Sequence, residues 1–384
     1  MKSKSALQFV LIIGIANFFA DFTYEGARGI IGPFLGSLGA SAAIVGFVAG
    51  LGELMGYGLR SISGYLADKS HRHWGFAFVG YAINMFAVPA LALAGRWPLA
   101  ASLVVAERTG RGIRKPTVEA MLSYAGGSIG AGWVFGLNEA LDQTGATLGP
   151  LVMALVLYFN GGYRTGFGVL LIPALLCLGT LVVARLLHPR PHELEQDASH
   201  AFSTTHLTRA YWIYFVAGAL LAAGFADFAL IGFHFQNANV VQKNMIPVFY
   251  AVAMATSALA SIPLGRLFDR LGPNVVLFAF FISAGAAPFV FLGTSGSALV
   301  GMILWGVGMS AQGSLLQAML TGVIPPQKRS TAFGLFDTGY GIAWFLGSAL
   351  MGLLYDKSIL AVVLFSVTLQ LAAIPILFIA SKNR

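Results

Sequence analysis

Apolar residues in this chain are gathered into runs of about 20 residues, the length that a helix needs to cross the hydrocarbon core of a bilayer. Apolar residues make up 57% of the 384 positions and charged residues only 10%, whereas a soluble domain has roughly 25% charged residues. Inside a bilayer the backbone must satisfy its own hydrogen bonds, so each run is expected to be a helix. The sequence therefore predicts an all-α membrane protein.

Twelve such runs are separated by turn-forming and polar residues. The predicted transmembrane helices are 7–35, 42–66, 74–94, 98–122, 129–158, 164–187, 209–236, 245–266, 274–293, 297–322, 329–354 and 359–381. The longest polar stretch, 188–208, contains prolines and acidic residues, as linkers do. We therefore predict an N-terminal six-helix bundle over 1–187, a cytoplasmic linker over 188–208 and a C-terminal six-helix bundle over 209–384.

The loop charges predict how the chain is oriented. Basic residues are frequent on the side that holds both termini and the linker, and few lie on the other side. By the positive-inside rule the termini and the linker are cytoplasmic, which requires an even number of spans. The N-terminus begins like a signal peptide, but no A-x-A site follows, so we predict an uncleaved first span. We expect a multi-pass protein of the cell membrane, and a monomer.

Short motifs recur about 200 residues apart. The segment GYLADKSHR (64–72) is echoed by LGRLFDRLG (264–272), FADF (19–22) by FADF (225–228), EAML (119–122) by QAML (317–320), and FGLNEA (135–140) by FGLFDT (333–338). Four matches in the same order indicate an internal duplication, and hence two pseudo-symmetric bundles of a transporter. In the repeated loops we expect an ion-paired conformational switch; the alternative is a solvated loop charge. Its residues are Gly64, Asp68 and Arg72 in the first loop and Gly265, Asp269 and Arg270 in the second.

These motifs resemble those of the major facilitator superfamily, and the resemblance covers essentially the whole chain. The GYLAD loop is similar to the loop that follows the family's second helix, and Arg108 with Gly112 is similar to its helix 4 motif. Gly136, Gly145, Gly149 and Pro150 match the spacing of the antiporter motif in its helix 5, although Met153 and Ala154 replace the usual trailing glycines. The resemblance implies a twelve-span transporter with alternating access. Physically, Gly145 and Gly149 permit close helix approach and Pro150 permits a bend; ordinary small-residue packing is the alternative.

Ionisable residues inside the predicted spans are concentrated in the first half. Asp21, Glu25 and Arg28 share one face of the first helix. The fourth helix carries Glu107, Arg108, Arg111, Arg114, Lys115 and Glu119, and the fifth carries Glu139 and Asp142. A charge at the bilayer centre costs roughly 2.5–3.5 kcal/mol, so such residues normally face a cavity or a partner. The second half offers Asp227, His234 and Asp337.

These carboxylates are the candidates for carrying a proton. Arg28 can pair with Asp21 or Glu25 on its own helix, or with a carboxylate of the fifth helix. A carboxylate whose arginine is alternately bound and drawn away can bind and release a proton. The alternative is a permanently paired structural network. The proton-coupling candidates are Asp21, Glu25, Glu139, Asp142 and Asp227.

The arginines also indicate the substrate class. Excess guanidinium groups suit carboxylate or phosphate, so we predict an organic anion or zwitterion, of amphipathic character. His234 is also interpretable as a structural histidine, and Lys115 with Glu119 as a surface i, i+4 pair. The substrate-binding candidates are Tyr24, Arg28, Arg108, Arg111, Asn138, Gln143 and His234.

Together these patterns predict a proton-coupled secondary transporter, with export in exchange for protons favoured by the helix 5 spacing. Uptake of an organic anion by proton symport and a non-transporting receptor on the same scaffold are the alternatives. No H-E-x-x-H or G-K-[ST] motif is present, and we predict no enzyme activity, no cofactor and no metal. The scattered basic residues do not form a nucleic-acid surface. The single Cys177 lies in an apolar run and is predicted to pack there.

Overall fold

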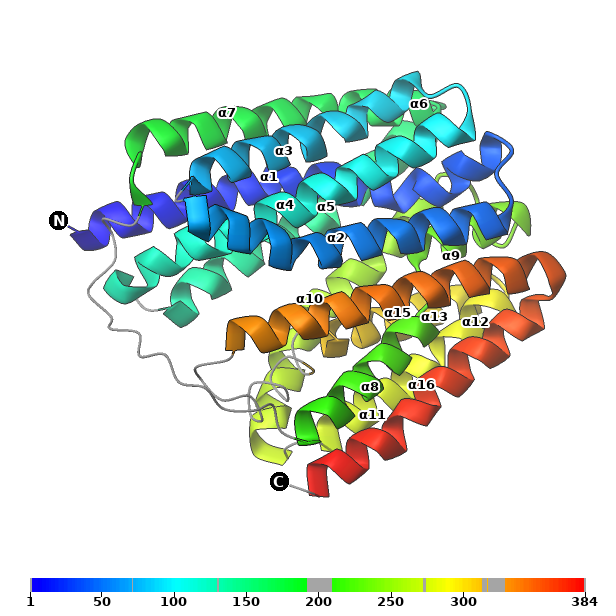
Figure 1. The fold of residues 1–384 in the computed structure, drawn as a ribbon. Helices are drawn as coiled ribbons and strands as arrows, with labels where there is room; N and C mark the ends of the chain where they lie inside the picture. The colour runs from blue at the N-terminus through cyan, green and yellow to red at the C-terminus, as the bar shows by residue number, and fades with distance from the viewer. Residues whose placement is uncertain are drawn as a thin grey trace. The chain divides into compact units, whose positions relative to one another are not determined.

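The computed structural model describes residues 2–70, 72–129, 131–191, 209–271, 274–312, 316 and 329–382. All regular structure in these residues is helical (Figure 1). The all-α class predicted from the sequence is therefore confirmed. The linker is described only as far as residue 191, so its predicted course lies outside the described residues.

The described residues of the first half form seven α-helices and one 3-10 turn. They are α1 (Lys2–Ser37), α2 (Ala42–Ser70), α3 (His73–Ala90), η1 (Leu91–Leu93), α4 (Trp97–Ile129), α5 (Ala131–Tyr158), α6 (Tyr163–Val169) and α7 (Leu171–Leu187). The second half contains α8 (Arg209–Gly224), α9 (Phe228–Asn237), α10 (Ile246–Leu271), α11 (Asn274–Ala284), α12 (Ala286–Phe291), α13 (Ser295–Ser310), α15 (Arg329–Lys357) and α16 (Ile359–Lys382). Helix is present in each of the twelve predicted ranges.

Some predicted boundaries were wrong. α4 continues to Ile129, so the loop expected over 123–128 is helical. The range 209–236 is divided into α8 and α9 rather than forming one helix. Eight segments of the described chain are long and apolar enough to cross a membrane, and two shorter apolar helices add to them. The count of twelve spans stays a prediction.

α7 shows why these helices belong in lipid. One of its faces is buried and carries Ala174, Cys177 and Leu181. The other face is also apolar, and Leu186 is 74% exposed there. A helix that is apolar on all sides suits a hydrocarbon solvent rather than water. Cys177 is a free, buried thiol, so its predicted packing role is confirmed.

Contacts gather the chain into two compact units. Unit 1 comprises residues 1–28 and 55–200, and unit 2 comprises residues 29–54 and 201–384. The end of α1 and the start of α2 therefore make their contacts with the second half of the sequence. The boundary between bundles that the sequence predicts, at residues 188–208, stays a prediction.

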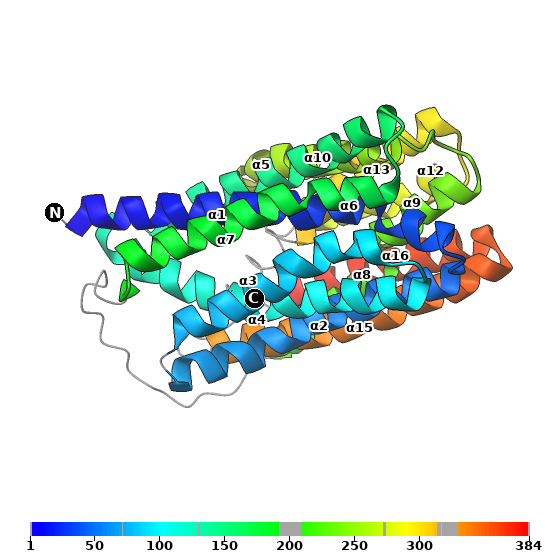
Figure 2. The ribbon, with the colours of Figure 1, turned by 90° about the horizontal axis from the view of Figure 1, so that it is seen from above.

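Within unit 1, α3 lies alongside α4 in both views (Figure 1, Figure 2). Gly80 and Gly110 allow this approach: a Cβ at Gly80 would lie 2.8 Å from the carbonyl oxygen of Gly110, and one at Gly110 would lie 2.5 Å from the amide nitrogen of Asn84. Backbone contact of this kind is typical of membrane helices, where small residues allow dispersion contacts between neighbouring helices. The close packing brings the polar side chains of α3 and α4 together.

α5 approaches α1 in the same way. A Cβ at Gly145 would collide with the carbonyl oxygen of Phe18, and one at Gly149 with that of Phe22. The close approach predicted for these two glycines is thus present, whereas their sliding role stays a prediction. Pro150 lies inside α5, which runs on to Tyr158.

Within unit 2, residues 29–54 pack on α9 and α15. A Cβ at Gly32 would collide with the carbonyl oxygen of Ala229, and one at Gly50 would lie 2.8 Å from that of Phe345. The carboxylate of Asp356 accepts hydrogen bonds from the backbone amides of Ala42 and Ala43, at 3.2 and 3.1 Å. These amides lie in the first turn of α2, which has no intrahelical acceptor for them. Asp356 therefore caps α2 from the end of α15.

Replacing Gly145 by alanine should destabilise the protein, because the new methyl group must push α5 away from Phe18. We expect a loss of roughly 1–3 kcal/mol, as for other overpacked positions. The matched control is Gly179→Ala in α7, where a Cβ meets nothing within 4 Å. Thermal unfolding in detergent, followed by tryptophan fluorescence, checks both. Equal midpoints for the two variants would contradict the prediction.

His188, directly after α7, should make stability depend on pH. Its ring packs edge-on against Phe9, with centroids 5.2 Å apart, and burial lowers the pKa of His188 below its ordinary value. Because its pKa is lower in the folded than in the unfolded protein, the stability linked to His188 is present above the unfolded pKa of about 6.5 and is lost as the pH falls below it. His188→Phe should flatten the decline of the unfolding midpoint between about pH 7 and pH 5. An unchanged slope in this variant would refute the assignment.

Candidate functional site

The guanidinium group of Arg114 is the centre of a polar cluster in unit 1. It lies 4.4 Å from the ring centroid of Tyr81 on α3 and 5.8 Å from that of Tyr24 on α1. Its Nη2 atom is 3.8 Å from Oδ1 of Asp21. Arg114 and Tyr24 are buried, and the Asp21 side chain is 13% exposed. The cation is thus held by two aromatic faces and a carboxylate.

A chain of side-chain amides extends from Arg114 to Asp142. Arg114 Nη1 donates to Oδ1 of Asn17 at 3.3 Å, and the hydroxyl of Tyr81 donates to the same oxygen. Nδ2 of Asn17 donates to Oδ1 of Asn138 at 2.7 Å. Nδ2 of Asn138 then donates to Oδ2 of Asp142 at 3.0 Å, one turn further along α5. The cluster therefore joins α1, α3, α4 and α5.

Arg111 occupies the more open side of this cluster. Its guanidinium carbon lies 4.8 Å from the centroid of the Tyr24 ring. Arg111 is half-buried, whereas Arg114, one turn further along α4, is buried. Tyr24 thus has one buried and one half-buried cation beside its ring.

One buried ion pair agrees with the sequence-based expectation and one differs from it. Arg28 lies 3.8 Å from Glu25 on its own helix, which is one of the three partners considered for it. Asp21 is instead paired with Arg114 of α4. The pairing of Asp21 was not predicted, because separation in sequence does not indicate which side chains of α1 and α4 meet.

Glu107 and Arg108 form a neighbouring polar group. Nε of Arg108 lies 3.3 Å from Oε2 of Glu107. Oε1 of Glu107 accepts a hydrogen bond from the Asn84 amide at 2.8 Å. All three side chains are buried, so the α3–α4 contact contains a second paired charge.

Two further candidates of unit 1 lie at the edge of the cluster. Gln143 donates to Oε1 of Glu139 at 2.8 Å, and Glu139 is exposed. Lys115 and Glu119 lie 3.9 Å apart with side chains 38% and 53% exposed, which confirms the surface i, i+4 pair. None of these four residues is joined to the amide chain by a hydrogen bond that the described residues show.

In unit 2, Asp227 lies where α8 ends and α9 begins. Its carboxylate accepts from the backbone amide of Ala229 at 2.9 Å, so it is the N-cap of α9. The carbonyl oxygens released by this break are satisfied by neighbouring helices. Ser366 and Gln370 donate to the Gly224 oxygen at 2.6 and 3.2 Å, and the Trp305 indole donates to the Ala226 oxygen at 2.9 Å.

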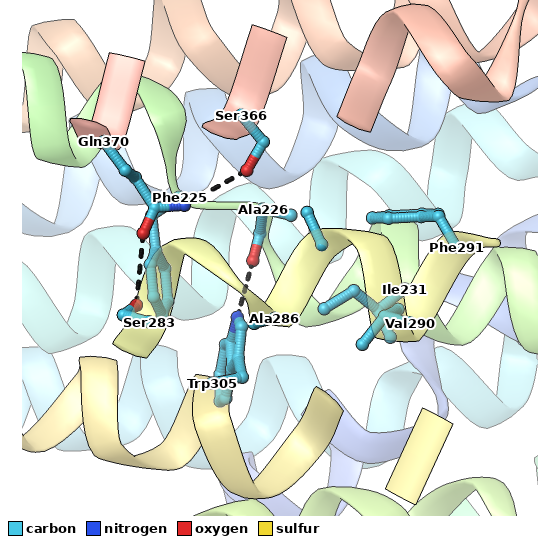
Figure 3. A pocket seen from close by; sticks show the side chains of 11 residues that line it. Phe225, Ala226, Ile231, Ser283, Ala286, Val290, Phe291, Trp305, Ser366 and Gln370 are labelled. Carbon is cyan, nitrogen blue, oxygen red and sulfur yellow. Dashed lines mark hydrogen bonds between the residues drawn. The ribbon is translucent and has the colours of Figure 1, made fainter. Parts of the chain in front are cut away.

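A cavity adjoins this break (Figure 3). It is small, with a volume of about 10 Å³ for the centre of a water-sized sphere. Ser283 and Gln370 are joined by a hydrogen bond of 3.1 Å at its polar edge, while Ile231, Val290 and Phe291 line its apolar part. The polar groups of the lining bind one another or the broken backbone.

His234, in the last turn of α9, lies in an aromatic setting. Its Nδ1 atom is 2.9 Å from the hydroxyl of Tyr355 on α15. The Phe291 ring centroid lies 5.1 Å from that of His234. This contact joins α9 to α15 inside unit 2, as the structural reading of His234 expects.

The residues predicted to act as switches lie in or beside helices. Gly64 is in α2, where a Cβ would lie 3.4 Å from Cβ of Pro116, and Arg72 directly precedes α3. Asp68 belongs to α2, and Gly265, Asp269 and Arg270 belong to α10, but their side chains lie outside the described residues. The predicted ion-paired switch therefore stays a prediction.

Sequence reasoning missed several polar residues of these sites. Asn17 and Asn84 stand alone in the apolar segments LIIGIANFF and GYAINMF, and a lone amide inside a span was the available signal. Tyr81 gave no signal, because an aromatic residue in a membrane helix usually faces lipid or the core. In unit 2 the missed residues are Ser283, Trp305, Ser366 and Gln370, which satisfy the broken helix.

Removal of the Arg114 side chain should leave Asp21 as a buried charge without its partner. We expect Arg114→Met to destabilise the protein by roughly 3–5 kcal/mol. Asp21→Asn in the same chain should recover part of this loss, because it removes the uncompensated charge. Unfolding midpoints of the two single variants and the double variant measure the coupling, with Arg111→Met as the half-buried control. Strict additivity of the two single losses would rule out a direct interaction.

Comparison with known proteins shows the family of the chain. The sequence profile of the Major Facilitator Superfamily matches residues 13–348 and 228–383. An uncharacterized protein of Mycobacterium tuberculosis (strain ATCC 25618 / H37Rv) is 37% identical over 380 residues, which cover 97% of this chain and 93% of that protein. An uncharacterized MFS-type transporter of Methanocaldococcus jannaschii is 24% identical over 358 residues, covering 91% and 89%.

Solved structures show the same fold. A mutant of the nucleoside transporter NupG superimposes with a TM-score of 0.78 at 13% identity, covering 96% of this chain and 99% of that one. At this identity the likeness concerns the fold alone. The helices, the charged cluster inside unit 1 and the profile match lead to one conclusion: the chain is a multi-pass membrane protein of the Major Facilitator Superfamily, a family of transporters rather than enzymes.

Proposed function

We propose that the protein is a proton-coupled secondary active transporter, which moves a small organic anion or zwitterion across the cytoplasmic membrane by alternating access of its two halves. Both termini and the linker lie in the cytoplasm in this proposal, and the transporter works as a monomer. Export in exchange for protons is the favoured direction.

The observation that carries the proposal is the pairing of Asp21 with Arg114 inside unit 1, at 3.8 Å. A membrane protein retains such charges in its interior at a cost, so they usually have a role in ion or substrate movement. Arg114 also donates to the amide chain that ends on Asp142. One cation thus interacts with two carboxylates on different helices, directly and through amides. An arginine shared in this way lets one carboxylate take up a proton when the other holds the cation.

Arg111 supports an anionic or zwitterionic substrate. Arg111 is half-buried, and its guanidinium carbon lies over the Tyr24 ring, 4.8 Å from the ring centroid. A planar guanidinium group beside an aromatic face suits a carboxylate or phosphate group attached to an apolar body. Tyr24 would then contact the apolar part of the substrate.

The direction of transport rests on the fifth helix. The spacing of Gly145, Gly149 and Pro150 is that of antiporters in the family that the sequence resembles, and both glycines lie against the backbone of α1. Uptake by proton symport is the second candidate, because the surplus cations of unit 1 attract an anion. A receptor on the same scaffold is the third, and it predicts no flux.

Proton movement in proteoliposomes tests the proposal. Purified protein is reconstituted with a pH-sensitive dye inside, and organic anions, zwitterions and nucleosides are added outside. Nucleosides are included because the structurally similar NupG is a nucleoside transporter. We expect compound-dependent proton movement that falls about tenfold or more in Asp21→Asn, as for loss of a proton-transfer group.

Glu119→Gln is the matched control, since it removes an exposed carboxylate of α4 and should leave proton movement unchanged. Proton movement opposite to the substrate identifies an exporter, and movement in the same direction identifies a symporter. Substrate flux without any proton movement would refute the coupling, and the absence of both fluxes would favour the receptor.

A further inference from the structure

In the chain of hydrogen bonds that leads from Arg114 through Asn17 and Asn138 to Asp142, the donors all point the same way. Oδ1 of Asn17 accepts from two donors, Arg114 Nη1 and the Tyr81 hydroxyl. This fixes the Asn17 amide, so its Nδ2 atom faces Asn138 and donates to it at 2.7 Å. The Asn138 amide is fixed in turn, and its Nδ2 atom donates to Asp142. Every donor in the chain therefore points from the cation toward the carboxylate.

The two oxygens of Asp142 differ. Oδ2 accepts the hydrogen bond from Asn138 at 3.0 Å. Oδ1 is buried, and no group in the described part of the chain forms a hydrogen bond with it. A buried acceptor without a hydrogen-bond partner costs free energy, and binding of a proton to that atom changes this cost. Oδ1 is consequently the atom of Asp142 to which a proton can add without displacing a protein donor.

We infer that Asp142 binds the transported proton at Oδ1, and that Asn17 and Asn138 are the positioning residues that couple this event to the Arg114–Asp21 ion pair. The inference rests on the proposed function and deepens it, because it selects one of several carboxylates and names the groups that connect it to the arginine. Asn138 then acts within this chain rather than as a substrate contact.

The coupling follows from the strength of charge-assisted hydrogen bonds. An ionised Asp142 is a strong acceptor and holds the Asn138 amide in place. When a proton binds Oδ1, Oδ2 becomes part of a neutral carboxyl group and a weaker acceptor. The side-chain amides of Asn138 and then Asn17 can rotate. This rotation weakens the hydrogen bond between Asn17 and Arg114, so the guanidinium group interacts with Asp21 alone of the two carboxylates. Release of the proton restores the original orientation.

Other charged groups act on Asp142 as well. Asp21 of α1, Arg114 and Lys115 of α4, and Glu139 of its own helix influence it electrostatically, and the Tyr81 hydroxyl of α3 lies within the same network. Glu139 is exposed and bonded to Gln143. The amide chain distinguishes Asp142 from these groups, because within the described residues Asp142 is the carboxylate at which the chain ends.

Infrared spectroscopy of the protein in lipid tests the site without a substrate. Wild-type protein titrated with acid should gain the carbonyl bands of protonated carboxyl groups, and the difference between the wild type and Asp142→Asn should contain the band of Asp142. Asn17→Leu and Asn138→Leu should shift the midpoint of the band by about half a pH unit or more, because the hydrogen-bonded chain to Asp142 is broken. Asn17→Ser repeats the test with a small polar side chain if the leucine variant does not fold.

Thr144→Val is the matched control. It removes another i, i+4 hydrogen bond of α5, the one that the Thr144 hydroxyl donates to the Ala140 carbonyl oxygen, and should leave the midpoint unchanged. The absence of a carboxyl band from this difference spectrum, throughout the pH range in which the protein stays folded, overturns the choice of Asp142. A band that is lost in Asp142→Asn but does not shift in the asparagine variants overturns the coupling role of the amides.

Proteoliposomes with the internal pH dye separate this inference from the proposed function. If the wild type couples flux to protons, Asp142→Asn should lose the coupling, and Asn17→Leu should move the pH midpoint of transport in the same direction as the infrared midpoint. Retained coupling in Asp142→Asn overturns the inference and leaves the proposed function standing. Failure of the wild type to move protons with any compound overturns both.

Discussion

The Arg114 guanidinium group is the constraint on which unit 1 depends, because a buried cation in a membrane protein must be surrounded by compensating groups. Tyr24, Tyr81, Asp21 and Asn17 supply them from α1 and α3. These partners fix how far the helices can rotate or slide. The requirement for compensation therefore orders the interior of unit 1, where apolar packing alone would permit several arrangements.

Close backbone approach makes this compensation possible. Gly80 and Gly110 bring α3 against α4, and Gly145 and Gly149 bring α5 against α1. Larger side chains at these positions would separate the helices, and the side-chain hydrogen bonds that join α1 to α5 at 2.7 Å and α4 to α1 at 3.3 Å would be lost. The polar network therefore depends on the small residues that let the helices approach.

The repeated FADF segment shows how an internal duplication can diverge. In α1 it lies inside a continuous helix, and Asp21 is available to pair with Arg114. In the second half the same four residues span the break between α8 and α9, where Asp227 caps a helix. In the second copy, Ser366, Gln370 and Trp305 donate hydrogen bonds to the carbonyl oxygens that the break releases. Identical local sequences thus take different roles in different surroundings.

The sequence by itself determined the all-α class, the approximate positions of the helices, the family and the group of charged residues within which the site lies. It could do so because apolar run length and motif spacing are local properties. The tertiary structure decided which charges meet: Asp21 with Arg114 rather than Arg28, and Asp142 with Asn138. It also decided the break before Asp227 and the inclusion of Asn17 and Tyr81. These features depend on helix rotation and register between segments far apart in the chain, which periodicity within one segment does not specify.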